Sequence, residues 1–351
     1  MKRLFDLLDS STDAALITSE INRRYFTGFK SSAGIALITR KSAYFLVDFR
    51  YIESAEKNVQ NFEVIQLENS ARQLSDIFES ENIKTVAVEG ESLTVSELEN
   101  YKNKFKNIEF ETSSLSPAIS KLRSVKTETE ISDIITAQRI AERAFDEVLN
   151  DIKPGKTERE IALRLDYLMQ KYGSSGVSFE TIVISGAKTS MPHGVPSDKP
   201  IKDGELLLFD FGAVYNGYHS DMTRTVAVGD VNEEIKEVYD IVLTAQEKAI
   251  AGARNSLKSH EYDAIARDYI ASKGYGKNFG HSLGHGVGLE IHEAPFTSPS
   301  NSCELKSGMV VTVEPGIYLA GKFGIRIEDM LVITDKSATD ITKTPKKLIK
   351  I

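Results

Sequence analysis

The chain has 351 residues, of which 41% are hydrophobic and 27% are charged, and its formal net charge is −8. This composition excludes a disordered or membrane-spanning chain, and the length predicts two domains of about 100–200 residues each. Because acids outnumber Lys and Arg, we expect neither a nucleic acid nor a membrane surface as a partner.

The N-terminus and the cysteine content indicate the compartment. Met1-Lys2-Arg3 could begin a leader peptide, but the run that follows is broken by acids too early for an apolar leader core. Cys303 is the only cysteine, which excludes an internal disulfide and suits a reducing environment. Its polar surroundings argue against a role as nucleophile. Together these features predict a cytoplasmic protein.

The first third of the chain alternates short apolar runs with polar-faced helical stretches, which predicts an α/β domain. Residues 35–48 are predicted to form a hairpin that turns at 40–42. A strand at 84–89 follows a helix, so we expect the sheet to be mixed. No residue cluster in this region suggests catalysis.

A long amphipathic helix is predicted after Leu122, with Thr127 and Glu130 forming a capping box at its start. The domain boundary is therefore expected just before it, which gives domains at 1–121 and 122–351.

A second helix is predicted after Thr157, ending near Gly173. The remainder, from Phe179 to Asp335, is predicted to be strand-rich. It contains all six histidines and every cluster that suggests chemistry.

An Asn-Gly pair at 216–217 lies between two apolar strands and predicts a tight hairpin, because both turn residues need φ > 0. Such a hairpin pairs Tyr215 with Tyr218. Counting outward makes Asp210 and Asp221 diagonal neighbours, about 7–8 Å apart, close enough for two carboxylates to share a cation. Asp210 lies in an apolar run, where an unpaired charge is costly, so a metal or another cation is expected beside it.

Three histidines then follow within twelve residues, among several glycines that let the backbone approach a ligand closely. They are His281, His285 and His292. A single histidine is more often structural than functional, but three so close together favour a site. The next apolar strand ends at Glu314, so a carboxylate lies at the end of that strand.

Polar and apolar residues alternate in the last predicted strand, so Arg326 and Glu328 share one face. The pair could form a surface salt bridge or belong to a site. The four acids and one histidine form a mostly oxygen-donor set that can hold two divalent ions. Such a set prefers manganese or cobalt over a metal that selects thiolates.

These segments resemble the metallopeptidases with the pita-bread fold, which include methionine aminopeptidase, prolidase, aminopeptidase P and creatinase. The resemblance begins near Arg123. The domain before it, with its DFRYIESA segment, is similar to that of the proline-specific and creatinase branches. It implies an α/β (α+β) chain with an N-terminal mixed-sheet domain and a C-terminal pita-bread domain. The family's metal ligands match Asp210, Asp221, His285, Glu314 and Glu328.

The resemblance also implies the activity, which is hydrolysis of the bond before proline by an Xaa-Pro dipeptidase (prolidase) or an Xaa-Pro aminopeptidase. The expected substrates are proline-containing di- or oligopeptides, and a homodimer is implied. Two divalent ions would share a hydroxide, with Glu314 as general base. Manganese is the first choice, with cobalt, zinc or iron as alternatives.

Further site residues follow from the resemblance alone. His193 and His292 match histidines that contact substrate and move protons, and His281 matches another active-site histidine. Tyr318 and Arg326 match positions that line the site, and Arg326 is expected to orient Glu328.

Several alternatives remain at this point. The ligand motif does not separate the dipeptidase from the aminopeptidase, although the modest N-terminal domain slightly favours the dipeptidase. Methionine aminopeptidase usually lacks that domain, and creatinase uses no metal. A non-catalytic binding module of the same fold is disfavoured by the complete ligand set and by the acidic chain.

Overall fold

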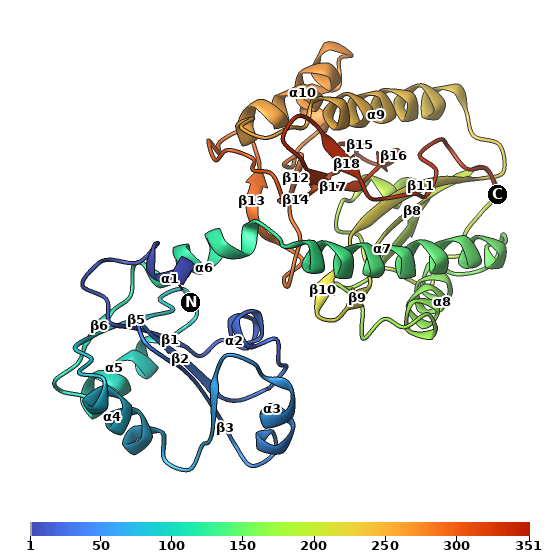
Figure 1. Cartoon of the computed structure of the whole chain (residues 1–351). Coiled ribbons are helices and arrows are strands. Elements are labelled where there is room, and N and C mark those ends of the chain that lie inside the picture. Colours follow the sequence, from blue (N-terminus) through green and yellow to red (C-terminus); the bar gives the residue numbers. More distant parts are fainter. Residues whose placement is uncertain (1) are drawn as a thin grey trace. The chain divides into compact units, whose positions relative to one another are not determined.

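The computed structural model describes residues 2–351, so Met1 lies outside the described part of the chain. The chain divides into two compact units, Met1–Arg123 and Ser124–Ile351 (Figure 1). No helix within residues 2–351 is both long enough and apolar enough to cross a membrane.

One mixed sheet forms the centre of the N-terminal unit. Its strands are β1 (Ala14–Ile17), β2 (Ile35–Thr39), β3 (Ala43–Val47), β4 (Glu63–Gln66), β5 (Thr85–Val88) and β6 (Glu109–Glu111). They lie in the order β4-β3-β2-β1-β5-β6. β1 pairs antiparallel with β2 and parallel with β5, which confirms the predicted mixed sheet. The predicted hairpin is confirmed as well, with Ile38 opposite Ala43.

Different helices cover the two faces of this sheet. They are α1 (Lys2–Phe5), α2 (Glu20–Thr27), α3 (Ile52–Asn58), α4 (Ser70–Ser80), α5 (Val95–Lys104) and α6 (Leu115–Ser124). Along β1, Ala15 and Ile17 share a buried cluster with α1, α3 and α6, whereas Ala14 and Leu16 share one with α4. Successive strand residues point to opposite faces, so the central strands β1, β2, β3 and β5, which are buried on both faces, are almost continuously apolar.

The C-terminal unit contains two larger sheets and two short hairpins. Its strands are β7 (Ile182–Ser185), β8 (Glu205–Phe211), β9 (Val214–Tyr215), β10 (Tyr218–His219), β11 (Met222–Val228), β12 (Gly284–Gly286), β13 (Glu293–Thr297), β14 (Val310–Val313), β15 (Gly316–Leu319), β16 (Phe323–Arg326), β17 (Asp329–Ile333) and β18 (Ala338–Asp340). The larger sheets have the orders β11-β8-β7 and β13-β12-β14-β17-β18, and the pairs β9-β10 and β15-β16 form the hairpins.

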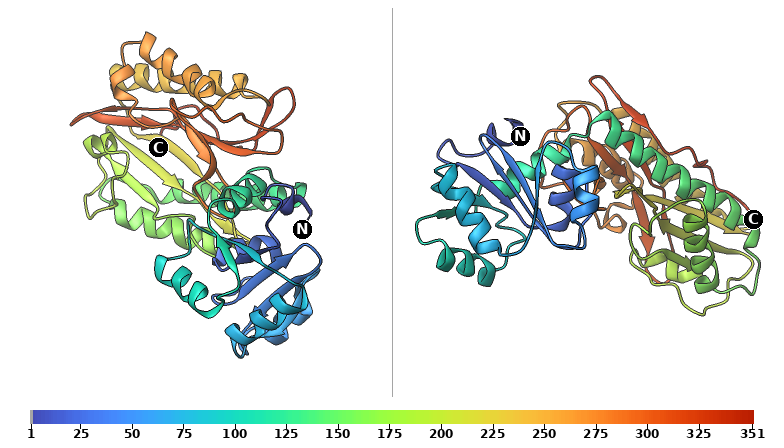
Figure 2. Two further views of the ribbon diagram at one scale, coloured as in Figure 1. Left: turned by 90° about the vertical axis from the view of Figure 1, so that its left-hand side faces the viewer. Right: turned by 60° about the horizontal axis from the view of Figure 1, so that its bottom comes forward.

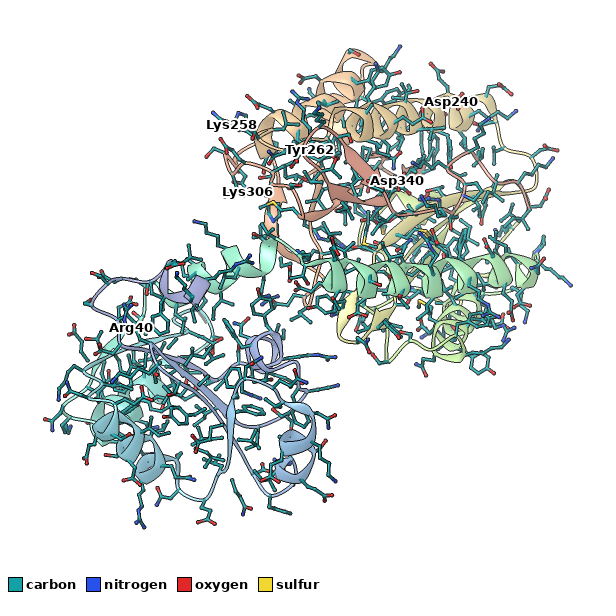
Figure 3. The ribbon with its side chains drawn as sticks, in the orientation of Figure 1. Arg40, Asp240, Lys258, Tyr262, Lys306 and Asp340 are labelled. Atoms are coloured by element: carbon teal, nitrogen blue, oxygen red, sulfur yellow. The ribbon has the colours of Figure 1, made fainter. Side chains whose placement is uncertain are left out.

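Four long helices enclose these sheets, namely α7 (Glu128–Val148), α8 (Glu158–Lys171), α9 (Glu233–Gly252) and α10 (Ser259–Ser272). α7 and α8 lie on one side of the strands, and α9 and α10 lie on the other (Figure 2). One buried cluster joins α7 and α8 to β7, β8 and β11, and another joins α9 and α10 to β14 through β17. Side chains fill the space between α9, α10 and the strands they cover, where Tyr262 of α10 is fully buried (Figure 3).

The helix starts follow their local signals. Thr127 and Glu130 form the predicted capping box of α7, and Thr157 caps α8 in the same way with Glu160. The expectation of a strand-rich segment from 179 to 335 was incomplete, because α9 and α10 occupy part of it. Both helices bury apolar residues at spacings of three and four, a pattern that the sequence contains and that strand signals on either side obscure.

The predicted Asn-Gly hairpin is confirmed. Asn216 and Gly217 have φ values of 46° and 82°, and Tyr215 lies opposite Tyr218. At Gly212, an added Cβ would lie 1.8 Å from the backbone oxygen of Ser220 on the other arm of the hairpin, so only glycine lets the two arms approach here. The tight hairpin therefore brings Asp210 of β8 close to Asp221, which directly precedes β11.

Candidate metal centre

Two acids reach the interior from β8 and β11. Along β8, Leu207 and Phe209 pack with α7 and α8, so Asp210 points to the opposite face and forms an ion pair with Arg326 of β16. Asp221 directly precedes β11 and is buried. The short hairpin between these strands brings the two acids into one interior.

The other candidate ligands come from the second sheet. His285 is the middle residue of β12, Glu314 directly follows β14, and Glu328 directly precedes β17. The backbone N–H of His285 donates to Thr312 Oγ1 at 3.0 Å, which ties β12 to β14. An added Cβ at Gly284 would lie 2.2 Å from the Thr312 carbonyl oxygen, so glycine permits this close approach.

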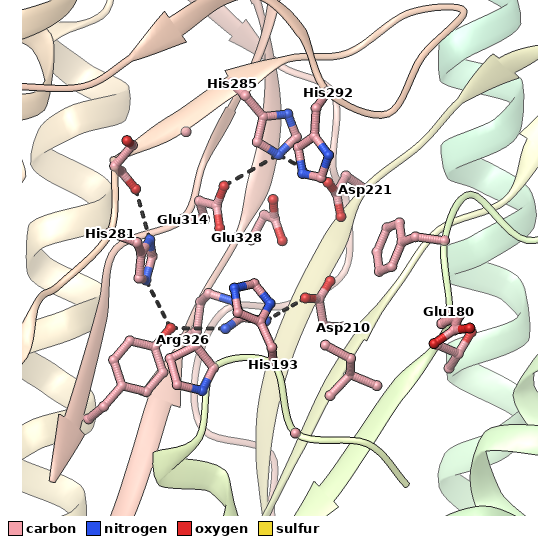
Figure 4. A pocket seen from close by; sticks show the side chains of 18 of the residues that line it. Glu180, His193, Asp210, Asp221, His281, His285, His292, Glu314, Arg326 and Glu328 are labelled. Atoms are coloured by element: carbon pink, nitrogen blue, oxygen red, sulfur yellow. Dashed lines mark hydrogen bonds and ion pairs between the residues drawn. The ribbon is translucent and has the colours of Figure 1, made fainter. Parts of the chain in front are cut away.

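The donor atoms of these residues converge (Figure 4). Asp221, His285 and Glu328 each offer one atom within 4.8 Å of the others. His285 Nε2 lies 3.5 Å from Asp221 Oδ2 and 3.5 Å from Glu314 Oε1. Four of the five predicted ligands thus surround one small volume, and Asp210 lines the same cavity.

That cavity has a volume of about 690 Å³. Every site residue predicted from the sequence lines it, namely His193, Asp210, Asp221, His281, His285, His292, Glu314, Tyr318, Arg326 and Glu328. Apolar side chains complete the wall, among them Phe179, Ile182, Val195 and Phe296. Cys303 is exposed and lies outside this lining, in agreement with the expectation that it has no part in the chemistry.

Burial and crowding raise the pKa values of the acids. Burial raises the pKa of Asp221 well above its ordinary value, and the charges of Glu328 and Asp210 add to the rise. Burial also raises the pKa of Glu328 well above its ordinary value, with Glu314 and Asp210 adding to it. For Glu314, burial raises the pKa to about 8, although Arg326 opposes this. Acids packed so closely cannot all ionise unless cations balance their charges.

His285 has the protonation state of a metal ligand. Burial lowers its pKa to about 4, and the nearby His292 adds to the effect, so the imidazole is neutral at neutral pH. Its Nδ1 lies 3.1 Å from the Gly286 carbonyl oxygen, which assigns the hydrogen to Nδ1 and leaves the Nε2 lone pair facing the acids. The contacts of Nε2 with these acids are therefore not ion pairs.

Three buried carboxylate oxygens have no hydrogen-bond partner among residues 2–351, namely Asp210 Oδ1, Asp221 Oδ1 and Glu328 Oε1. An unsatisfied buried acceptor is costly. We therefore expect the partner of these oxygens to be a bound species and not another protein group. A set of carboxylates with one neutral imidazole suits a divalent cation. The residues present therefore fit a divalent metal.

A hydrogen-bonded chain runs along another wall of the cavity. Arg326 donates to Asp210 Oδ2 and, at 2.9 Å, to Tyr318 Oη, which in turn lies 2.9 Å from His281 Nε2. The sequence led us to expect that Arg326 orients Glu328. Arg326 contacts Asp210 directly. It reaches Glu328 through Thr223, because Arg326 Nε donates to Thr223 Oγ1 at 3.0 Å and that hydroxyl donates to Glu328.

Two threonines in the site were not predicted. Thr223 Oγ1 donates to Glu328 Oε2 at 2.7 Å, and Thr312 Oγ1 donates to Glu314 Oε1 at 3.2 Å. Each lies two positions from a candidate ligand along a strand, and side chains on a strand share a face at that spacing. The period of two was the signal that could have found them.

Family models agree with this architecture. Residues 132–335 match metallopeptidase family M24, and residues 3–125 match the creatinase/prolidase N-terminal domain. The chain belongs to metallopeptidase family M24. As an M24 enzyme it is a hydrolase of peptides, its C-terminal unit has the pita-bread fold, and its family uses divalent metal ions.

Individual M24 relatives align over almost the whole chain. An Xaa-Pro dipeptidase of Pyrococcus furiosus is 39% identical, over 99% of both chains. The structure of an Xaa-Pro dipeptidase from Bacillus anthracis is 42% identical with a TM-score of 0.96, over 100% of this chain and 98% of that one. The structure of an X-Pro aminopeptidase from Thermotoga maritima is 39% identical with a TM-score of 0.94, over 99% of this chain and 100% of that one.

Proposed function

We propose that this M24 peptidase hydrolyses the bond that precedes a proline, as an Xaa-Pro dipeptidase or Xaa-Pro aminopeptidase. The observation that carries the proposal is the convergence of Asp221, His285, Glu314 and Glu328 around carboxylate oxygens without partners. Full-length relatives named for each of the two activities support it. The proposed substrates are di- or oligopeptides with proline in the second position.

Asp210, Asp221, His285, Glu314 and Glu328 would hold two divalent ions. Manganese is the first choice for such an oxygen-rich set, and cobalt, zinc or iron also suit it. Bound ions of this kind lower the pKa of a shared water and polarise the scissile carbonyl.

The protein's own residues would move the protons. Glu314 would accept the proton of the attacking water as general base, since its carboxylate lies beside His285 in the cavity where that water would be held. His292 and His193 would donate to the carbonyl oxygen and pass a proton to the prolyl nitrogen, which as a tertiary amide has no hydrogen of its own.

The remaining cavity residues would hold the substrate. His281 and Tyr318 are joined to Arg326 through hydrogen bonds and would orient the peptide from one wall. Phe179 and Phe296 belong to the apolar part of the lining, which suits a proline ring better than a charged side chain.

The setting of the enzyme is part of the same proposal. We propose functional domains at 1–121 and 122–351, a homodimer, and action in the cytoplasm, where a free Cys303 stays reduced.

A peptide panel tests the proposal. The metal-stripped enzyme would be assayed with and without manganese on Ala-Pro, Ala-Pro-Ala, Ala-Ala and Met-Ala-Ser. We expect manganese-dependent cleavage of one or both prolyl peptides only, and the ratio of their kcat/KM values assigns dipeptidase or aminopeptidase. Cleavage of Met-Ala-Ser alone would instead indicate a methionine aminopeptidase. No cleavage and no bound divalent ion would indicate a binding module.

A further inference from the structure

The loop that follows β7 carries His193 along the cavity. It comprises residues 186–199, begins with the 3-10 helix Gly186–Ser190, and contributes residues 192–196 to the cavity lining. Its tip is exposed, with 59% of Met191 and 66% of Val195 accessible to solvent. A loop with so exposed a tip can hold a histidine in a defined position only if its ends are fixed.

Both ends of this loop are hydrogen-bonded to one carboxylate, that of Glu158 at the start of α8. At the first end, Ser185 donates to Glu158 Oε1 from its backbone N–H at 2.8 Å and from its hydroxyl at 3.0 Å. At the second end, Ser197 donates to Oε2 from its backbone N–H at 3.0 Å and from its hydroxyl at 2.7 Å. The Glu158 side chain is fully buried, so these bonds replace water completely.

Lys188 joins the two arms of the loop. Its ammonium group lies 2.7 Å from Glu158 Oε2. It also donates to the Val195 carbonyl oxygen at 2.5 Å and to Ser197 Oγ at 2.9 Å, both on the arm beyond His193. One ion pair therefore closes the base of the loop just before the exposed tip begins.

A separate tether fixes the 3-10 helix to the sheet. Thr189 is fully buried, and its Oγ1 accepts from the backbone N–H of Gly324 on β16 at 2.8 Å. An added Cβ at Gly324 would lie 2.2 Å from the Thr189 carbonyl oxygen, so the loop and β16 are in direct backbone contact. β16 ends at Arg326, which lines the cavity and forms an ion pair with the candidate ligand Asp210.

The contacts of Glu158 require a carboxylate. Burial raises the pKa of Glu158, but hydrogen bonds from Lys188, Ser197 and Ser185 outweigh it, so the pKa lies below its ordinary value. The two oxygens accept five hydrogen bonds in all. Glutamine would present an NH₂ donor in place of one oxygen, and that donor would face a serine N–H or the lysine ammonium.

We propose that Glu158 is a positioning residue that fixes both ends of loop 186–199 and thereby sets the position of His193 in the cavity. The inference rests on the proposed function, because it takes His193 to contact the substrate. The hydrogen bonds of Glu158 go to the loop and not to any candidate metal ligand, so metal binding is expected to be independent of it.

Glu158→Gln tests the proposal with two readouts. In the manganese-loaded enzyme we expect kcat/KM for a cleaved prolyl peptide to fall by about 10–100-fold, because small displacements of a positioned group cost that much. In a His193→Ala background the same change is expected to have less than about a twofold further effect, since the two residues act as one unit. Hydrogen–deuterium exchange should rise in residues 186–197, and the Kd for manganese should stay the same.

Two matched variants accompany it. Lys188→Met removes the ammonium group that links the two arms of the loop. We expect it to lower kcat/KM less than Glu158→Gln does, and to speed hydrogen–deuterium exchange in the same segment. Glu160→Gln is the control, because Glu160 lies on the same helical turn but hydrogen-bonds Thr157 and Lys156 and not the loop, and glutamine can keep the capping box with Thr157. It should leave activity and loop exchange unchanged.

The inference is overturned if Glu158→Gln keeps the parent kcat/KM, if it lowers kcat/KM equally in the His193→Ala background, or if loop exchange does not change. A parent enzyme that cleaves no prolyl peptide would refute the proposed function instead. The exchange experiment would then still decide whether Glu158 anchors the loop.

Discussion

Two adjacent buried acids, Glu328 and Asp329, have opposite surroundings. Asp329 accepts hydrogen bonds on both oxygens, from Arg224 at 2.7 Å, Gln246 at 2.8 Å and Lys346 at 2.6 Å. Glu328 Oε2 accepts from Thr223 at 2.7 Å, but Glu328 Oε1 has no partner among the described residues. The two neighbouring residues thus point to opposite sides of the chain. Asp329 has hydrogen-bond donors on both oxygens, whereas Glu328 has one oxygen without a donor in the described part of the chain.

The pKa values of the two acids move in opposite directions. Burial raises the pKa of Asp329, but Arg224 and Lys346 outweigh it, so the pKa falls below its ordinary value. Burial raises the pKa of Glu328 well above its ordinary value, and other acids add to the rise. A buried acid whose donors are all supplied by the protein is satisfied by the fold itself, and removing one partner of such a pair is destabilising. A buried acid left open among other acids indicates a site for an external cation.

Removing the open acid should abolish function and leave the fold intact. We expect Glu328→Ala to lower prolyl-peptide hydrolysis by about a thousandfold or more, because the charge that stabilises the reaction is lost with the metal. The metal-free variant should be at least as stable as the parent, since one of several crowded acids is gone. Metal analysis and urea unfolding check this, and a variant that keeps full metal content and turnover would contradict it.

Removing Glu314, which is both the proposed base and a proposed metal ligand, should abolish turnover and leave the fold intact. We expect Glu314→Ala to reduce kcat by about 10²–10⁴-fold, the range for a general base. The circular dichroism spectrum and the melting temperature of the metal-free protein should match those of the parent. Near-normal kcat on a prolyl peptide would disprove the assigned role.

Removing the paired acid, Asp329, should instead destabilise the fold and leave metal binding intact. Asp329→Asn leaves Arg224, which is 1% exposed, without its counter-charge, so we expect a loss of about 3–5 kcal/mol in the free energy of unfolding. The folded fraction should still bind the parent's number of manganese ions. Urea titration with metal analysis measures both quantities, and metal loss at unchanged stability would reverse our interpretation of the two acids.

The smallest expected effect concerns pH. The pKa of Glu314 is about 8 in the folded chain and about 4.5 ordinarily, so the folded metal-free protein binds this proton more tightly than the unfolded chain does. The contribution of Glu314 to stability is present below its ordinary pKa and is lost as pH rises to about 8.

We therefore expect the melting temperature of the chelated protein to fall between pH 5 and 8, by about 2–4 °C per kcal/mol of lost stability. Manganese should flatten this dependence and release protons on binding. Thermal scans in chelator and in manganese measure the difference. Equal slopes in the two conditions would show that the cation does not replace these protons.

Much of the fold was predictable because its signals are local. The turn at Asn216-Gly217 depends on two residues that tolerate positive φ, and the start of α7 depends on Thr127 and Glu130. The helices α9 and α10 were missed because their apolar period competes with strand patterns on both sides. The direct contact of Arg326 with Asp210 was not predicted, because nothing near Arg326 in the sequence indicates that β8 lies alongside.

The site residues were recognisable by type and order, and their roles as ligands and catalysts remain predictions. Asp210 and Asp221 could be related through one hairpin, because strand geometry alone sets their spacing. No local rule relates them to His285 or Glu314. Thr223 and Thr312 could have been found by the period of two, once a neighbouring acid was taken as a ligand.

The sequence by itself determined the chemical types of the donors, the hairpins and helix caps that position them locally, and the family to which they belong. Only the tertiary structure decided which buried acids are paired and which stay open. Arg224, Gln246 and Lys346 reach Asp329 from distant segments, and no hydrogen-bond donor within residues 2–351 reaches Glu328 Oε1. Burial, charge pairing and pKa depend on what surrounds a side chain in three dimensions, and for these two acids those neighbours lie far away in sequence.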